Sequence, residues 1–219
     1  MNLKTLTLTL KSNKPVEEAA AKLSGFFATR FTGYALLHQH IDVDKLLYKY
    51  PRIQYKILEG AAIVLGIEEG AEVLKEIYDK YDEITLGEST YTIVERGITI
   101  KEEEFGISTE ILSYEFITPW IALSQQNYQR YVESKRDDRR ELLRRTLIGN
   151  ILSASKGLDY VVLDDIKLAI GRLRRRKCEL KGTSFIGFLG EFMVNFLIPD
   201  YMGLGKSVSR GFGTVKRVN

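Results

Sequence analysis

Two histidines, His38 and His40, stand one residue apart in the segment LLHQH and are the only histidines among the 219 residues. An unperturbed imidazole has a pKa near ~6.5, so it can accept or release a proton at neutral pH. On an extended segment this spacing places both rings on the same side of the chain. The pair is therefore a candidate for general acid–base catalysis, with one ring as the base and the other as the acid.

The histidine pair could instead be structural, or it could bind a metal ion. A metal site in a protein needs three or four ligands, but the sequence has no third histidine and a single cysteine, Cys178. Asp42 and Asp44 are the nearby acids that could complete such a site. The expectation is that the protein uses neither a metal nor a cofactor.

A glycine-rich loop, GLGKSVSRGFG, spans residues 203–213. Its glycines are Gly203, Gly205, Gly211 and Gly213. It is neither of the two common nucleotide-binding loops, because Asp200 and Val208 stand where their motifs need a glycine. Glycines let the backbone approach a ligand closely, and Lys206, Ser207 and Arg210 would suit a phosphodiester. A tight structural turn between two strands is the alternative.

Basic residues are concentrated in the C-terminal part of the chain. Residues 128–219 carry 19 Lys and Arg against 10 Asp and Glu, a net charge of +9, whereas residues 1–127 have a net charge of −6. Four arginines recur at helical spacing: Arg136, Arg139, Arg140 and Arg144. In RLRRRK (172–177), an extended chain would place Arg172, Arg174 and Arg176 on one side. Guanidinium groups suit phosphate oxygens, although solvated surface charge would explain the helical group as well.

The hydrophobic patterns predict an α+β fold. Alternation predicts a strand over 3–11, and helical spacing predicts helices over 15–31 and 68–81. Two strands meet at Glu59-Gly60, and one or two more lie in 89–104. This order, β-α-β-β-α-β, is that of a ferredoxin-like domain.

The second half repeats this pattern less regularly. It has a strand-like segment over 107–120, a basic helix over 126–157, strand-rich segments over 165–180 and 183–198, and a last short strand. We therefore predict two tandem ferredoxin-like (RRM-like) domains, residues 1–117 and 118–219, the second irregular. The lone cysteine and the absence of a signal peptide or membrane span favour a soluble, cytoplasmic protein.

Three features together resemble the RAMP superfamily of CRISPR-associated proteins. They are the glycine-rich loop before a short terminal strand, the phrase YPRIQYK (50–56), and histidines between the first helix and that phrase. Within the superfamily, the chain looks like the endoribonucleases that process precursor CRISPR RNA. The resemblance implies His38 and His40 as catalytic residues, CRISPR repeat RNA as the substrate, and no divalent metal. It implies products with a 2′,3′-cyclic phosphate and a 5′-hydroxyl.

Two competing functions remain. The first is a non-catalytic RNA-binding subunit of a CRISPR effector complex, in which the histidines are structural. The second is a metal-dependent nuclease that uses the histidines with Asp42 or Asp44. Whether the protein forms a homodimer, or associates with other subunits of an effector complex, also stays open.

Overall fold

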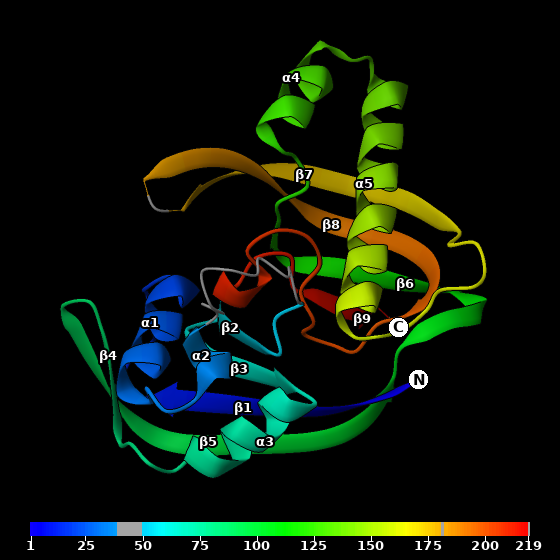
Figure 1. The fold of residues 1–219 in the computed structure, drawn as a ribbon. Helices are drawn as coiled ribbons and strands as arrows, with labels where there is room; N and C mark the ends of the chain where they lie inside the picture. The colour runs from blue at the N-terminus through cyan, green and yellow to red at the C-terminus, as the bar shows by residue number, and fades with distance from the viewer. Residues whose placement is uncertain (39–49, 181, 219) are drawn as a thin grey trace. The chain divides into compact units, whose positions relative to one another are not determined.

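The computed structural model describes residues 1–38, 50–180 and 182–218, without the side chain of His38 (Figure 1). The chain forms two compact units. The N-terminal unit comprises residues 2–103 and 208–211, and the C-terminal unit comprises Met1, 104–207 and 212–219. The division after residue 103 precedes the expected boundary at residue 117, which falls inside strand β6 (Gly106–Trp120).

Five strands form the antiparallel sheet of the N-terminal unit, in the order β2-β3-β1-β5-β4. They are β1 (Asn2–Ser12), β2 (Ile53–Leu58), β3 (Ala61–Ile67), β4 (Glu83–Leu86) and β5 (Ser89–Glu104). Helices α1 (Ala20–Arg30) and α3 (Glu69–Ile77) lie on the same face of this sheet (Figure 1). Leu23 and Phe27 of α1 and Leu74 of α3 belong to one hydrophobic core with the strands. The helical spacing of the apolar residues therefore reflects burial of one face of each helix against the sheet.

The turn between β2 and β3 is confirmed at the expected dipeptide. Glu59 and Gly60 have φ angles of 51° and 78°. Two consecutive residues in the left-handed region make the tight turn whose twist matches the flanking strands. This turn sets the register in which Tyr55 pairs with Val64 and Lys56 pairs with Ile63.

One local expectation in the N-terminal unit, the start of the first helix, is wrong. The first helix begins at Ala20 rather than at residue 15, because the preceding residues serve as a connection. In that connection, the buried Val16 donates its backbone N–H to the Gly60 carbonyl at 2.8 Å. After α1 the chain forms a short helix, α2 (Ala35–His38), whose Leu37 is buried in the core.

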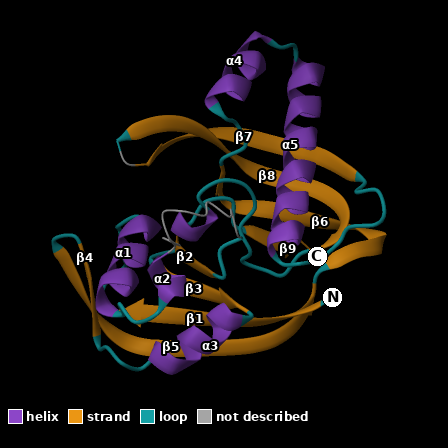
Figure 2. Cartoon of the chain, viewed as in Figure 1, coloured by secondary structure: helices purple, strands orange, loops and turns teal. Residues whose placement is uncertain are grey.

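Four strands form the sheet of the C-terminal unit, in the order β7-β8-β6-β9 (Figure 2). Besides β6, they are β7 (Leu168–Leu180), β8 (Thr183–Leu197) and β9 (Val215–Val218). The helix expected over 126–157 is two helices, α4 (Gln125–Glu133) and α5 (Arg136–Gly157). They separate at Ser134, whose extended backbone (φ −78°, ψ 154°) ends α4.

Helix α5 packs its apolar stripe into the C-terminal unit. Leu143, Leu147 and Ile151 recur along the helix and are buried, while the charged residues occupy the other positions. This spacing is that of an amphipathic helix on a sheet. No helix in the described part of the chain is both long and apolar enough to cross a membrane. The chain is thus a mixed α+β protein with two antiparallel sheets.

Candidate nucleic-acid interface

The two ends of the glycine-rich loop are joined by backbone hydrogen bonds in the C-terminal unit. Leu204 N–H donates to the Gly213 carbonyl at 2.8 Å, and Gly213 N–H donates to the Pro119 carbonyl at 3.0 Å. Gly213 has a φ of 65°, and a Cβ atom there would lie 2.0 Å from the Leu204 oxygen. No side chain fits at this position, so Gly213 is required by the closure of the loop.

Gly205 has a similar structural reason to be glycine. Its φ is 97°, and a Cβ atom would lie 2.8 Å from Nε1 of the buried Trp120. That Nε1–H donates to Asn150 Oδ1 at 2.9 Å. The loop then continues with the exposed Lys206 and the half-buried Ser207, whose φ is 56°. A structural turn therefore accounts for Gly205 and Gly213 but assigns no role to the exposed Lys206.

The middle of the loop belongs to the N-terminal unit. Val208–Arg210 forms a single 3₁₀ turn, η1, which packs against α1 and β2. Gly211 follows with a φ of 89°, and a Cβ atom there would lie 2.7 Å from Ala20 Cβ and 3.2 Å from the Tyr55 oxygen. Glycine thus lets the segment lie close to the strand. Arg210 is half-buried in this turn.

Beside η1, strand β2 carries a lysine whose role the sequence did not reveal. Lys56 has no exposed surface, and its Nζ donates to Gln54 Oε1 at 3.2 Å. Burial lowers the pKa of the Lys56 amine to about 7. Residues 54 and 56 share one face of β2, and Tyr55 lies on the other. The signal in the sequence was a polar pair alternating with apolar residues, which normally indicates a solvated face rather than a buried one.

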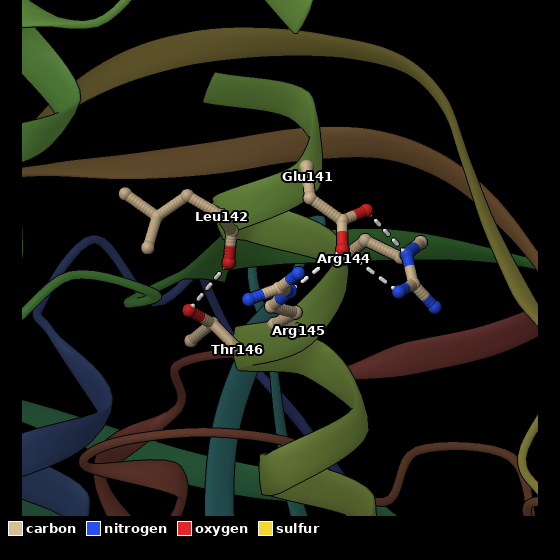
Figure 3. A network of polar contacts seen from close by, with 5 residues as sticks. All are labelled: Glu141, Leu142, Arg144, Arg145 and Thr146. Carbon is tan, nitrogen blue, oxygen red and sulfur yellow. Dashed lines mark hydrogen bonds and ion pairs between the residues drawn. The ribbon is translucent and has the colours of Figure 1, made fainter. Parts of the chain in front are cut away.

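Helix α5 holds most of its predicted RNA-binding arginines in contacts within the protein, and Figure 3 shows this for Arg144, which lies with Arg145 beside Glu141. Arg144 donates from Nε and Nη2 to the two oxygens of Glu141 at 2.6 and 2.8 Å, and Arg145 Nε donates to the same carboxylate at 2.7 Å. These hydrogen bonds, first from Arg144 and then from Arg145, lower the pKa of Glu141 to about 2. One acid therefore partly neutralises two cations.

Two further arginines of α5 connect secondary-structure elements. Arg139 donates from Nε to the Tyr131 carbonyl at 2.7 Å and from Nη2 to the Val132 carbonyl at 2.6 Å. It thereby satisfies the last carbonyl groups of α4. Arg140 donates from Nη2 to the Ile170 carbonyl of β7. Arg136 differs, because its side chain is exposed and its guanidinium has no hydrogen bond or ion pair within the described residues.

The arginines of β7 remain available. The extended conformation expected for residues 172–177 is confirmed, with Arg174 opposite Leu189 and Arg176 opposite Gly187. Arg175 lies opposite the buried Phe188 and so faces the core side of the sheet, whereas Arg174 and Arg176 face the other side. Arg172 lies where the register shifts, between Ile170 and Leu173. All three predicted arginines are exposed and, among the described residues, form no ion pair.

The histidine pair is described only in part. His38 is the last residue of α2, and its side chain lies outside the described structure. His40, Asp42 and Asp44 also lie outside the described residues. Because His38 is helical, the extended geometry considered for the pair does not apply at that residue. Over residues 1–37, 50–180 and 182–218, no three His, Cys, Asp or Glu side chains are grouped to hold a metal ion.

Comparisons with known proteins identify relatives over the whole chain. Residues 1–104 match the family model of the Cas6b N-terminal domain, and residues 106–218 match that of the Cas6b C-terminal domain. An uncharacterised protein of Methanocaldococcus jannaschii is 46% identical over 143 residues, which is 65% of this chain and 97% of that protein.

Solved structures agree with this assignment. A crystal structure of Cas6b is 37% identical, covers 100% of both chains and has a TM-score of 0.89. A crystal structure of a CRISPR RNA processing endoribonuclease, also Cas6b, is 35% identical, covers 100% of both chains and has a TM-score of 0.79. Together the two family models match nearly the whole chain, and each of the two solved structures covers all of it. The chain therefore belongs to the Cas6b family.

Proposed function

We propose that the protein is an endoribonuclease that cleaves CRISPR repeat RNA in precursor transcripts without a metal ion. The observation that carries this proposal is the match of the entire chain to a CRISPR RNA processing endoribonuclease at 35% identity. The two histidines of the sequence support it, because imidazole groups can transfer protons at neutral pH.

In the proposed mechanism, His38 and His40 act as general base and general acid. The base removes the proton from a 2′-hydroxyl, and the resulting oxygen attacks the adjacent phosphorus. The bond from phosphorus to the 5′-oxygen breaks, and the acid gives that oxygen a proton. The products are a 2′,3′-cyclic phosphate and a 5′-hydroxyl. Lys206, Ser207 and Arg210 of the glycine-rich loop would bind the RNA backbone and offset the charge that develops on phosphorus.

The order of the strands supports a common architecture for both units. In each sheet the first strand of the unit lies between the third and the last, as β2-β3-β1-β5 and as β7-β8-β6-β9. We infer that both units are ferredoxin-like. In the second, the glycine-rich loop occupies the place in the chain that α3 occupies in the first.

For RNA binding, we assign the main role outside the loop to the exposed arginines. These are Arg136 and the β7 group, Arg172, Arg174 and Arg176. Arg139 and Arg140 already donate hydrogen bonds to α4 and β7, and Arg144 is paired with Glu141 of its own helix, so these three arginines are less available to RNA. Contacts from arginine to phosphate raise nucleic-acid affinity and make it depend on salt.

Replacing Arg174 and Arg176 together by alanine should weaken the binding of repeat RNA by roughly tenfold or more, because charge-assisted hydrogen bonds are lost. The slope of log affinity against log salt should become shallower by up to about 0.7 per lost phosphate contact. The matched control is Arg175→Ala with Lys177→Ala, which removes the same charge from the other side of β7. A control that weakens binding as much as the test variant would contradict the assignment of the RNA-facing side.

Incubation of the protein with repeat RNA in EDTA tests the reaction itself. Cleavage should continue in EDTA and should stop when a 2′-deoxynucleotide replaces the nucleotide whose 2′-oxygen attacks. The 5′ fragment should end in a 2′,3′-cyclic phosphate, which mass spectrometry identifies. Cleavage that returns only on addition of divalent ions would indicate a metal-dependent nuclease, and RNA binding without any cleavage would indicate a binding subunit.

A further inference from the structure

The buried lysine of β2 has no role in the proposed mechanism. Lys56 is completely buried, and within the described residues its amine has one hydrogen-bond acceptor, Gln54 Oε1. Gln54 is also completely buried, and its Nε2 donates to the Pro51 carbonyl at 3.3 Å. An ammonium group has three donors, and burying a charge without a counter-charge is strongly unfavourable. Burial of this amine therefore lowers the stability of the folded protein, and we look for its reason in function.

The described strands, helix and turn of the N-terminal unit around Lys56 supply no counter-charge. Strand β3, which pairs with β2, has only apolar residues and glycine over 61–67. The turn η1 contributes one charged residue, the cation Arg210. On the other face of β2, where Phe27 of α1 contacts Tyr55, the charged residues of the helix are Lys22 and Arg30. Glu59 lies beyond the end of β2, in the turn to β3. Among the described charged residues of these elements, the cations outnumber the single acid, so their net charge is positive.

Lys56 lies directly beside the glycine-rich segment. A Cβ atom on Gly211 would be 3.8 Å from Lys56 Cα and 3.2 Å from the Tyr55 oxygen. Gly211 also closes η1, because its N–H donates to the Val208 carbonyl at 3.3 Å. The segment Val208–Gly211 is therefore in van der Waals contact with the backbone that carries Lys56.

We propose that Lys56 is a positioning residue for the RNA backbone, and that its amine takes up a proton when a phosphodiester binds at the adjacent segment Val208–Gly211. This inference rests on the proposed function, since RNA supplies the anion. The bound phosphate provides the counter-charge that the described residues around Lys56 do not supply. Protonated Lys56 then holds the anion electrostatically through the glycine-rich segment, so that RNA binding depends on pH.

The direction of this pH dependence follows from the state of the free protein. Burial lowers the pKa of Lys56 to about 7, so about half of the molecules carry a neutral amine at pH 7 and about nine-tenths at pH 8. A nearby phosphate favours the charged form and raises that pKa. RNA binding then consumes protons above pH 7, and affinity should fall by up to about tenfold per pH unit between pH 7.5 and 8.5.

The experiment measures binding of the full-length protein to repeat RNA from the source organism's CRISPR array. All 2′-hydroxyls are replaced by 2′-fluoro groups, which prevents attack by a 2′-oxygen. EDTA is present, which prevents metal-dependent cleavage. Calorimetry in two buffers of different ionisation enthalpy gives the number of protons taken up. Wild type should take up close to one proton per RNA at pH 8, and Lys56→Met should take up correspondingly fewer and show a flatter pH profile.

Two further variants make the result specific. Lys56→Arg keeps a permanent charge, so it should bind with a flatter pH profile than wild type and more tightly than Lys56→Met at pH 8.5. Lys11→Met removes an exposed lysine of β1 and should retain the wild-type profile. A wild-type pH profile identical to that of Lys56→Met would overturn the role of Lys56 alone. Absence of RNA binding by wild type at every pH would overturn the proposed function as well. If Lys56→Met does not fold, a wild-type proton uptake near zero at pH 8 would still refute the inference.

Discussion

His38→Ala and His40→Ala should each slow the cleavage of repeat RNA by roughly 10²–10⁴-fold, because each removes one of the two proton transfers. Single-turnover rates with saturating enzyme measure this step directly. The dissociation constant for RNA should stay within about threefold of wild type, since the arginines and the glycine-rich loop supply the binding energy. The rate should then show a flatter dependence on pH in each variant, because one titrating group has been removed.

A matched control and a modified substrate make this prediction sharper. Gln39→Ala changes the residue between the histidines and should cleave at nearly the wild-type rate. Once the cut site is mapped, an RNA with sulfur in place of the 5′-bridging oxygen identifies the acid, because a thiolate leaves without needing a proton. This substrate should rescue only the variant that has lost the acid. If both alanine variants cleave like wild type, or if they lose RNA affinity as much as rate, the histidines are structural.

Hydrophobic periodicity predicted most of the elements that place this site. The alternation in β1 and the dipeptide Glu59-Gly60 were sufficient, because period 2 and a two-residue turn are local properties of the chain. The residue at which α1 begins, in contrast, depends on a contact with a distant part of the chain. Residues 15–19 resemble a first helical turn, but Val16 instead bonds to Gly60, a partner distant in the sequence. Short β4 (Glu83–Leu86) was missed because four residues carry too little pattern.

For the basic residues as well, the sequence predicted the local structure but not the tertiary contacts. RLRRRK was predicted as an exposed basic strand, and β7 confirms the strand and its alternation. On α5, helical spacing correctly placed the arginines on a helix, but it could not show that Glu141 holds two of them or that Arg139 caps α4. Lys56 was undetectable, since a polar residue in an alternating strand indicates a solvated face unless tertiary structure covers it. The spacing of the cations therefore predicted the helix and the strand on which they lie. The tertiary structure showed which of them already donate hydrogen bonds within the protein.

Lys56 should also make the stability of the protein itself depend on pH. Its pKa is about 7 in the folded protein against 10.5 for an ordinary lysine, so between these values the unfolded chain binds a proton that the folded protein does not. The free energy of unfolding should therefore increase with pH in this range, by up to about 1.4 kcal/mol per pH unit. Below pH 7 both states are protonated, and the full cost of burying the charge, on the order of 4–5 kcal/mol, is present.

Lys56→Met removes this contribution. The variant lacks the buried charge but also loses the hydrogen bond from Lys56 Nζ to Gln54 Oε1, which costs about 1 kcal/mol at every pH. Relative to wild type it should be most stabilised below pH 7, and the difference in the free energy of unfolding should shrink as the pH rises toward 9. Urea unfolding of both proteins at a series of pH values measures that difference, in which all other titrating groups cancel. Lys11→Met, which changes an exposed lysine, should show the same dependence of the free energy of unfolding on pH as wild type. A difference between Lys56→Met and wild type that stays constant from pH 6 to pH 9 would mean that the amine of Lys56 keeps its proton in the folded protein, and the proton uptake proposed for RNA binding would be excluded with it.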